Sequence, residues 1–159
     1  MITEEYVEKQ DNKKKNKTKI YAVIIAFIVA FAIFFPLHVN NGYKEKTIEC
    51  ENWGCRIVLP DGWKGKCDYE IEDEYISAYF RKSRIFGERG WLFIIKRWDG
   101  IYTEKQVEEE LNVAPNIYLG THDGYTYLIT CASGVETNTF YEEYDKLYQR
   151  IGEIYIEFY

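Results

Sequence analysis

The feature that most constrains this chain is an uninterrupted charge-free run near its N-terminus. Residues 20–39 contain no Asp, Glu, Lys or Arg, and most of them are apolar. A helix over this run would be about 30 Å long at 1.5 Å per residue, which matches the hydrocarbon core of a bilayer. Because backbone hydrogen bonds in lipid are satisfied only in helices or closed barrels, we expect one transmembrane helix over 20–39 in contact with the lipid bilayer.

Charges on either side of the run predict its direction across the membrane. Residues 1–19 contain six Lys against four acidic residues, and five of these Lys lie between Lys13 and Lys19. Basic segments are retained in the cytoplasm, so we expect residues 1–19 to be a cytoplasmic tail and residues 40–159 to lie outside the cell. The protein would then be a single-pass protein of the cell membrane.

A cleaved signal peptide is the alternative, since Ala30-Phe31-Ala32 resembles a small-x-small cleavage site. However, the region before the run is long for a signal peptide, and cleavage after Ala32 would leave an apolar end beginning at Ile33. An uncleaved anchor is therefore the favoured interpretation.

The remaining residues are enough for one domain, which we place at 47–159 after a linker at 40–46. Residues 40–159 contain 14 basic and 22 acidic side chains. An acidic surface repels phosphates and offers few basic groups for counterion release, which argues against a nucleic-acid partner.

Hydrophobic patterns within this domain predict an antiparallel sheet with helices packed on it. β-Branched and aromatic residues favour strands, and Asp123-Gly124 favours a hairpin turn. Capping-box patterns at Thr103 with Gln106, and at Thr139 with Glu142, each precede a predicted helix. Gly152 weakens the second helix, so its last turns are alternatively a terminal strand. The predicted strands are residues 55–59, 67–71, 74–81, 91–98, 116–119 and 124–131. The fold class is therefore α+β.

Three patches of this domain resemble one group of proteins. They are Leu59-Pro60-x-x-Trp63-Lys64-Gly65-Lys66, the strand beginning Gly90-Trp91, and the later Gly124-Tyr125-x-Tyr127 strand with the closing helix. Together they resemble uncharacterised secreted or membrane-anchored proteins of Firmicutes. The resemblance implies a PsbP-like fold, an α/β/α sandwich that serves mainly as a binding or accessory module, and it implies no chemistry. The four cysteines and the uncleaved anchor depart from that group.

The cysteines are candidate disulfide residues because all four, Cys50, Cys55, Cys67 and Cys131, fall in the predicted extracellular part. Four cysteines allow three pairings, and the sequence does not separate them. Cys50 with Cys55 would close a small loop around Trp53, leaving Cys67 to pair with Cys131. Inert buried thiols are the main alternative. The spacing does not fit a zinc site, so we expect no metal and no cofactor.

Three tryptophans, Trp53, Trp63 and Trp98, are candidate binding residues. Each lies beside Gly, Asp or Asn at a predicted loop or strand end, where an exposed indole ring can stack on a sugar or anchor a protein. Trp63 follows an Asp-Gly turn, and a ring that fills one end of the core is an equal alternative for it. No nucleophile-elbow, phosphate-loop or zinc-protease motif is present, and the carboxylate runs are typical of solvated faces. We therefore expect no catalytic residues and a non-catalytic binding module at the cell surface, with an unknown protein or cell-wall partner. The alternatives are an extracytoplasmic thiol enzyme using Cys131 and His122, and a cell-wall glycan-binding module.

Overall fold

The computed structural model describes residues 19–35, 42–43, 45–110 and 115–159. The chain divides into two compact units, Met1–His38 and Val39–Tyr159. In the first unit, residues 19–35 are helical. The predicted cytoplasmic tail up to residue 18, and the last four residues of the predicted 20–39 span, lie outside the described residues. Among the residues that are described, no helix has both the length and the apolarity needed to cross a membrane.

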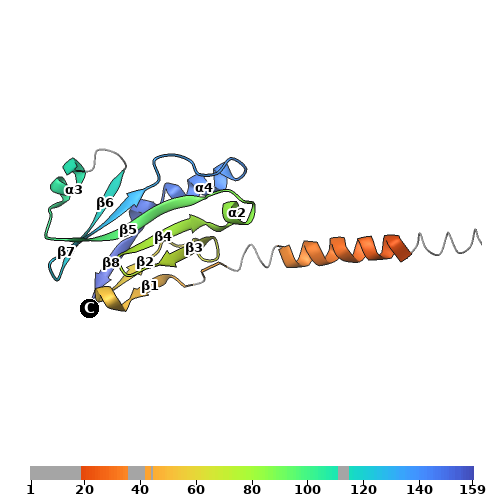
Figure 1. The fold of residues 1–159 in the computed structure, drawn as a ribbon, viewed down its shortest axis with the longest axis horizontal. Helices are drawn as coiled ribbons and strands as arrows, with labels where there is room; N and C mark the ends of the chain where they lie inside the picture. The colour runs from red at the N-terminus through yellow and green to blue at the C-terminus, as the bar shows by residue number, and fades with distance from the viewer. Residues whose placement is uncertain (1–18, 36–41, 44, 111–114) are drawn as a thin grey trace, which may run out of the picture. The chain divides into compact units, whose positions relative to one another are not determined.

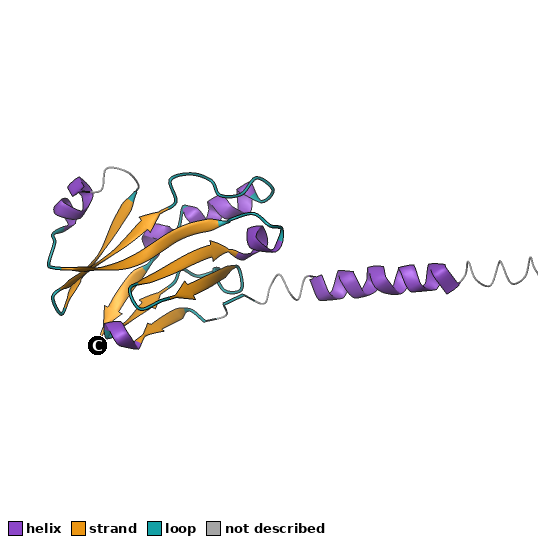
Figure 2. Cartoon of the chain, in the orientation of Figure 1, coloured by secondary structure: helices purple, strands orange, loops and turns teal. Residues whose placement is uncertain are grey.

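The second unit is α+β, as predicted, but its antiparallel strands form two sheets where one was expected (Figures 1 and 2). The smaller sheet has the order β1-β2-β8, and the larger has the order β3-β4-β5-β7-β6. The strands of the smaller sheet are β1 (Thr47–Cys50), β2 (Cys55–Val58) and β8 (Tyr155–Phe158). Those of the larger sheet are β3 (Cys67–Ile71), β4 (Tyr75–Phe80), β5 (Trp91–Asp99), β6 (Asn116–His122) and β7 (Tyr125–Cys131).

The helices of this unit are short. They are η1 (Glu51–Trp53), α2 (Arg81–Ile85), α3 (Glu104–Glu110), α4 (Tyr141–Tyr148) and η2 (Ile151–Glu153). The two helices predicted after Thr103 and Thr139 are confirmed as α3 and α4. The second was expected to continue towards the end of the chain, but α4 ends at Tyr148. The alternative of a terminal strand is correct for residues 155–158, because β8 pairs with β2, which lies near the start of the domain in the sequence.

One face of the larger sheet is packed against the smaller sheet and α4. The alternation along β4 buries Ile76, Ala78 and Phe80 completely on this inner face. The core cluster contains these three residues, inward-facing residues of β5 and β7, apolar residues of β1 and β2, and Tyr144 and Leu147 of α4. The core therefore fills the space between the two sheets and α4.

On the opposite, outer face of the larger sheet, a described helix packs near β6 and β7. There α3 packs against β6, burying Val107, and the chain before α3 crosses Thr126 of β7. The Thr126 hydroxyl donates to the Gly100 carbonyl at 2.8 Å and accepts from the Tyr102 N–H at 2.9 Å. Towards β3 and β4 the outer face carries partly exposed side chains, and this part holds the candidate site.

Candidate functional site

A groove of about 340 Å³ lies on the outer face of the larger sheet, over β4 and β5. The register of these strands sets Ser77 opposite Ile94 and Tyr79 opposite Trp91. Alternate residues of a strand share a face, so Tyr75 lines the same groove as Ser77 and Tyr79. The groove is lined by Tyr75, Ser77, Tyr79, Arg89, Trp91 and Ile94. Three aromatic rings therefore gather on one open sheet face.

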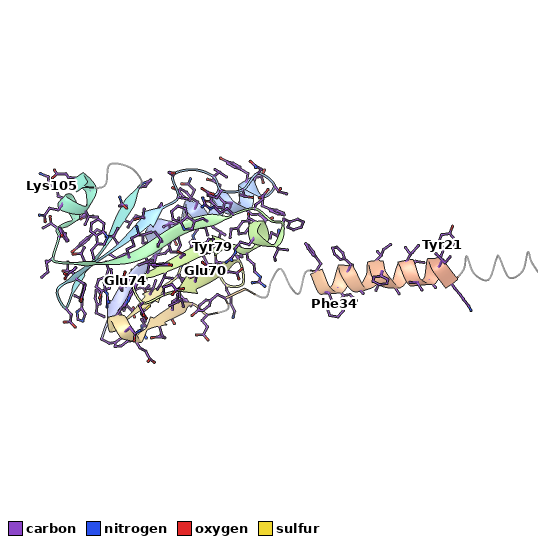
Figure 3. All side chains as sticks on the ribbon, viewed as in Figure 1. Tyr21, Phe34, Glu70, Glu74, Tyr79 and Lys105 are labelled. Carbon is purple, nitrogen blue, oxygen red and sulfur yellow. The ribbon has the colours of Figure 1, made fainter. Side chains whose placement is uncertain are left out.

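The rings differ in exposure and in how firmly they are held. Tyr75 is 40% exposed, whereas Tyr79 and Trp91 are half-buried. The Tyr79 hydroxyl donates to Glu70 Oε2 at 3.0 Å, and Figure 3 shows these two side chains beside each other on β4 and β3. The Arg84 guanidinium lies 4.5 Å from the Tyr79 ring centre and pairs with Glu70 at 3.0 Å. Burial and the bond to Glu70 raise the pKa of Tyr79, so its hydroxyl stays protonated at neutral pH.

A β-bulge and a tight turn shape one end of the groove. The register between β4 and β5 shifts between Ala78 and Tyr79, which brings Tyr79 opposite Trp91. Just before β5, Gly90 has a φ of 61°, accepts from the Phe80 N–H at 2.6 Å and donates to the Glu136 carbonyl at 2.8 Å. This turn leads into the part of the groove lining that Arg89 and Trp91 form.

The three tryptophans predicted as binding residues do not form a site together. Trp53 is only 5% exposed, with its Nε1–H donating to the Asp73 carbonyl at 2.7 Å, and Trp63 is 2% exposed against Phe93. The prediction of Trp53 as an exposed ring is wrong, because its loop folds the indole into the core. For Trp63 the alternative, a ring that fills part of the core, is confirmed. Trp98 is half-buried and contacts Tyr102 edge-on.

The groove residues were not predicted as binding residues. Tyr75, Tyr79 and Trp91 lie in the predicted strands at 74–81 and 91–98, where aromatic residues are typical of sheet packing. The sequence did contain a signal, since the alternation in residues 74–81 separates Tyr75 and Tyr79 from the apolar Ile76, Ala78 and Phe80. It did not show that the polar-aromatic face is left open.

All four cysteines are buried free thiols in the structure. The suggested pairing of Cys67 with Cys131 is wrong, because β4 and β5 lie between the strands that carry them. At about 4.8 Å per strand this separates the two by roughly 14 Å, well beyond the reach of a disulfide. Burial raises the pKa of Cys67 to about 12 and that of Cys131 to about 11.

The thiol–imidazole pair suggested for an enzyme is also wrong. His122 pairs with Tyr125 at the turn end of the β6–β7 hairpin, whereas Cys131 is the last residue of β7. Six residues of extended strand separate Tyr125 from Cys131 by roughly 20 Å. The His122 ring instead stacks on Phe158 at 4.5 Å.

A second hollow, of about 390 Å³, lies between η1 and the turn after β3. Its lining includes Cys50 and Trp53, two candidate residues from the same short segment, and Asp73 from the turn after β3. Within the described part of the chain, no group of three or more His, Cys, Asp or Glu residues is arranged to hold a metal ion.

Comparison with known proteins adds no assignment to this geometry. No protein-family model, no curated protein and no solved structure matches the chain.

Proposed function

We propose that the domain is a non-catalytic binding module at the cell surface, and that the groove over β4 and β5 binds sugar rings of a cell-wall glycan. The observation that carries this proposal is the cluster of Tyr75, Tyr79 and Trp91 on an open sheet face. Aromatic rings offer flat apolar surfaces with polar edges, which suits the faces of pyranose rings.

The polar groups around these rings support the same class of ligand. Ser77 and Arg89 line the groove, and Glu70 with Arg84 lies beside Tyr79. Planar carboxylate and guanidinium groups can hydrogen-bond neighbouring hydroxyls, and ligand pockets combine a few such groups with apolar walls. The groove volume of about 340 Å³ is at the small end of ordinary ligand pockets, which fits one or two sugar rings.

Anchoring in the membrane and a PsbP-like fold are part of this proposal. The support for an anchor is the charge-free run at 20–39, the lysines before it, and exposed apolar side chains along the helix at residues 19–35. The support for a PsbP-like arrangement is that α4 packs on the inner face of the larger sheet and α3 packs on its outer face. The anchor predicts that alkaline carbonate leaves the full chain in the membrane pellet, and release into the supernatant would contradict it.

Titration of the full chain in mild detergent with soluble wall fragments tests the binding function. Trp91 lines the groove, so binding should change the tryptophan fluorescence, and Trp91→Leu should remove most of that change. Trp98→Leu is the control, because Trp98 does not line the groove. A wild-type chain that binds no fragment, or a Trp91→Leu variant with an unaltered response, would overturn the proposed ligand class.

A further inference from the structure

The first hairpin of the domain holds two cysteines at directly opposite positions. Cys50 ends β1, Cys55 begins β2, and the two are opposite partners in the antiparallel register. Opposite residues of such a pair have Cα atoms about 4.5–5.5 Å apart, within the range that disulfides span. The Cys50 thiol donates to the Ile48 carbonyl at 3.6 Å. The backbone register therefore places the two cysteines at a spacing that a disulfide spans.

The two thiols are not equivalent. Cys50 lines the 390 Å³ pocket, whereas Cys55 is completely buried behind it. The neighbouring Cys55 thiol lowers the pKa of Cys50, whereas the Cys50 sulfur, together with burial, raises the pKa of Cys55. A reagent in the pocket thus meets the thiol that ionises more easily.

The pocket is acidic and its walls are fixed. Glu49, Glu51, Glu72 and Asp73 line it, and none of these carboxylates forms an ion pair with another described residue. Two hydrogen bonds connect the loop of Trp53 to the turn after β3. The Trp53 indole N–H donates to the Asp73 carbonyl, and Asn52 Nδ2 donates to Asp73 Oδ1 at 3.3 Å. This negative field attracts cations and repels anions.

We propose that Cys50 and Cys55 are a redox-active dithiol that reacts with small cationic disulfides entering this pocket. The Cys50 thiolate attacks one sulfur of the disulfide, which forms a mixed disulfide and releases one thiol. The Cys55 sulfur then attacks Cys50, which forms the Cys50–Cys55 bond and releases the second thiol. Two protein thiols are oxidised, one small disulfide is reduced, and the two thiol protons end on the released thiols.

The site is independent of the proposed sugar groove, because none of its residues lines that groove. The other two cysteines provide an internal control. Cys67 and Cys131 lie in the core without a cysteine partner, so they should keep their thiols throughout.

Mass spectrometry of the full chain treated with cystamine tests the order of the two steps. The wild type should lose two free thiols and give a linked peptide joining Cys50 to Cys55. Cys55→Ser should accumulate a mixed disulfide on Cys50, whereas Cys50→Ser should react at least about tenfold more slowly. In each variant, protection of Cys67 and Cys131 from alkylation shows that the domain is folded. A wild type that loses no thiols would overturn the proposal. So would equal rates of modification at Cys55 in the Cys50→Ser variant and at Cys50 in the Cys55→Ser variant.

A matched pair of aliphatic disulfides tests the ligand class. Each rate is divided by the rate of the same disulfide with free cysteine. Cystamine, a dication, should then react about tenfold faster than dithiodipropionate, a dianion, and salt should reduce the difference. Glu49→Gln and Glu72→Gln should each reduce the rate difference between the two disulfides. Glu157→Gln, on β8, should leave this difference unchanged. Equal or faster reaction of the dianion would overturn the cationic class.

Discussion

At the scale of single residues, Glu88 joins two distant segments of the chain. Its carboxylate accepts hydrogen bonds from the hydroxyls of Thr137 and Thr139 and from the N–H groups of Asn138 and Thr139. These bonds order the loop that leads into α4. They also lower the pKa of Glu88 below its ordinary value of 4.5.

Glu88→Gln should lower the free energy of unfolding at pH 7, because an amide accepts these four bonds less well than a carboxylate. A carboxyl whose pKa is lower in the folded state stabilises above its unfolded pKa, and that contribution disappears as the pH falls through the folded value. The difference between wild type and variant, measured by urea denaturation, should therefore shrink below pH 4.5.

Glu142→Gln is the matched control for this change. The sequence predicts that Glu142 forms a capping box with Thr139, but Thr139 bonds to Glu88 instead, so that prediction is wrong. A larger loss of stability in Glu142→Gln than in Glu88→Gln would contradict the role of Glu88 in ordering this loop.

The tryptophans show why single residues on the candidate site were hard to predict. Asn52 and Gly54 around Trp53 are typical of an exposed loop, and the backbone there does turn. The indole nevertheless enters the core, because Tyr127 and Arg97, both far along the chain, contact its ring. Exposure of a loop side chain depends on such distant partners, which local sequence does not contain.

At the scale of elements, the turn between α2 and β5 aligns β5 with β4. A Cβ at Gly90 would lie 2.6 Å from Ser83 Cβ and 2.8 Å from the Phe80 carbonyl oxygen. Gly87, in the same turn, also has a positive φ, but a Cβ there would meet nothing within 4 Å. The two glycines therefore separate the cost of the backbone conformation from the cost of a clash.

Gly87→Ala should cost about 1–2 kcal/mol, the strain of a left-handed residue with a side chain. Gly90→Ala adds a clash with backbone and should cost about 2–5 kcal/mol in total. It should also move Trp91 and so reduce ligand binding in the groove. Thermal and urea unfolding of the two variants measure the costs, and equal losses would show that the close packing at Gly90 is not important.

Elements defined by local chemistry were the ones that the sequence predicted. The Asp123-Gly124 turn forms as expected, with positive φ at both residues. Thr103 and Gln106 form the predicted capping box, since each N–H bonds to the other side chain. β8 remained an alternative to helix, because only pairing with β2 decides its conformation. The division into two sheets also depends on long-range pairing.

At the scale of the whole domain, the two faces of the larger sheet have different roles. The inner face is buried in the core, where it packs against the smaller sheet and α4. The outer face is covered near β6 and β7 by α3 and its preceding segment. Because the part over β4 and β5 stays open, its aromatic rings are available for a ligand, which is the basis of the proposed binding function.

The most direct test of this function compares two exposed tyrosines on strands. Tyr75, 40% exposed, lines the groove, whereas Tyr155, 51% exposed, lies on β8 and does not. Calorimetric titration of the full chain with soluble wall fragments should show affinity about two- to tenfold weaker in Tyr75→Ser, from the loss of one stacked ring. Tyr155→Ser should bind like the wild type. Equal affinity in all three proteins, or a loss confined to Tyr155→Ser, would contradict the groove as the binding site.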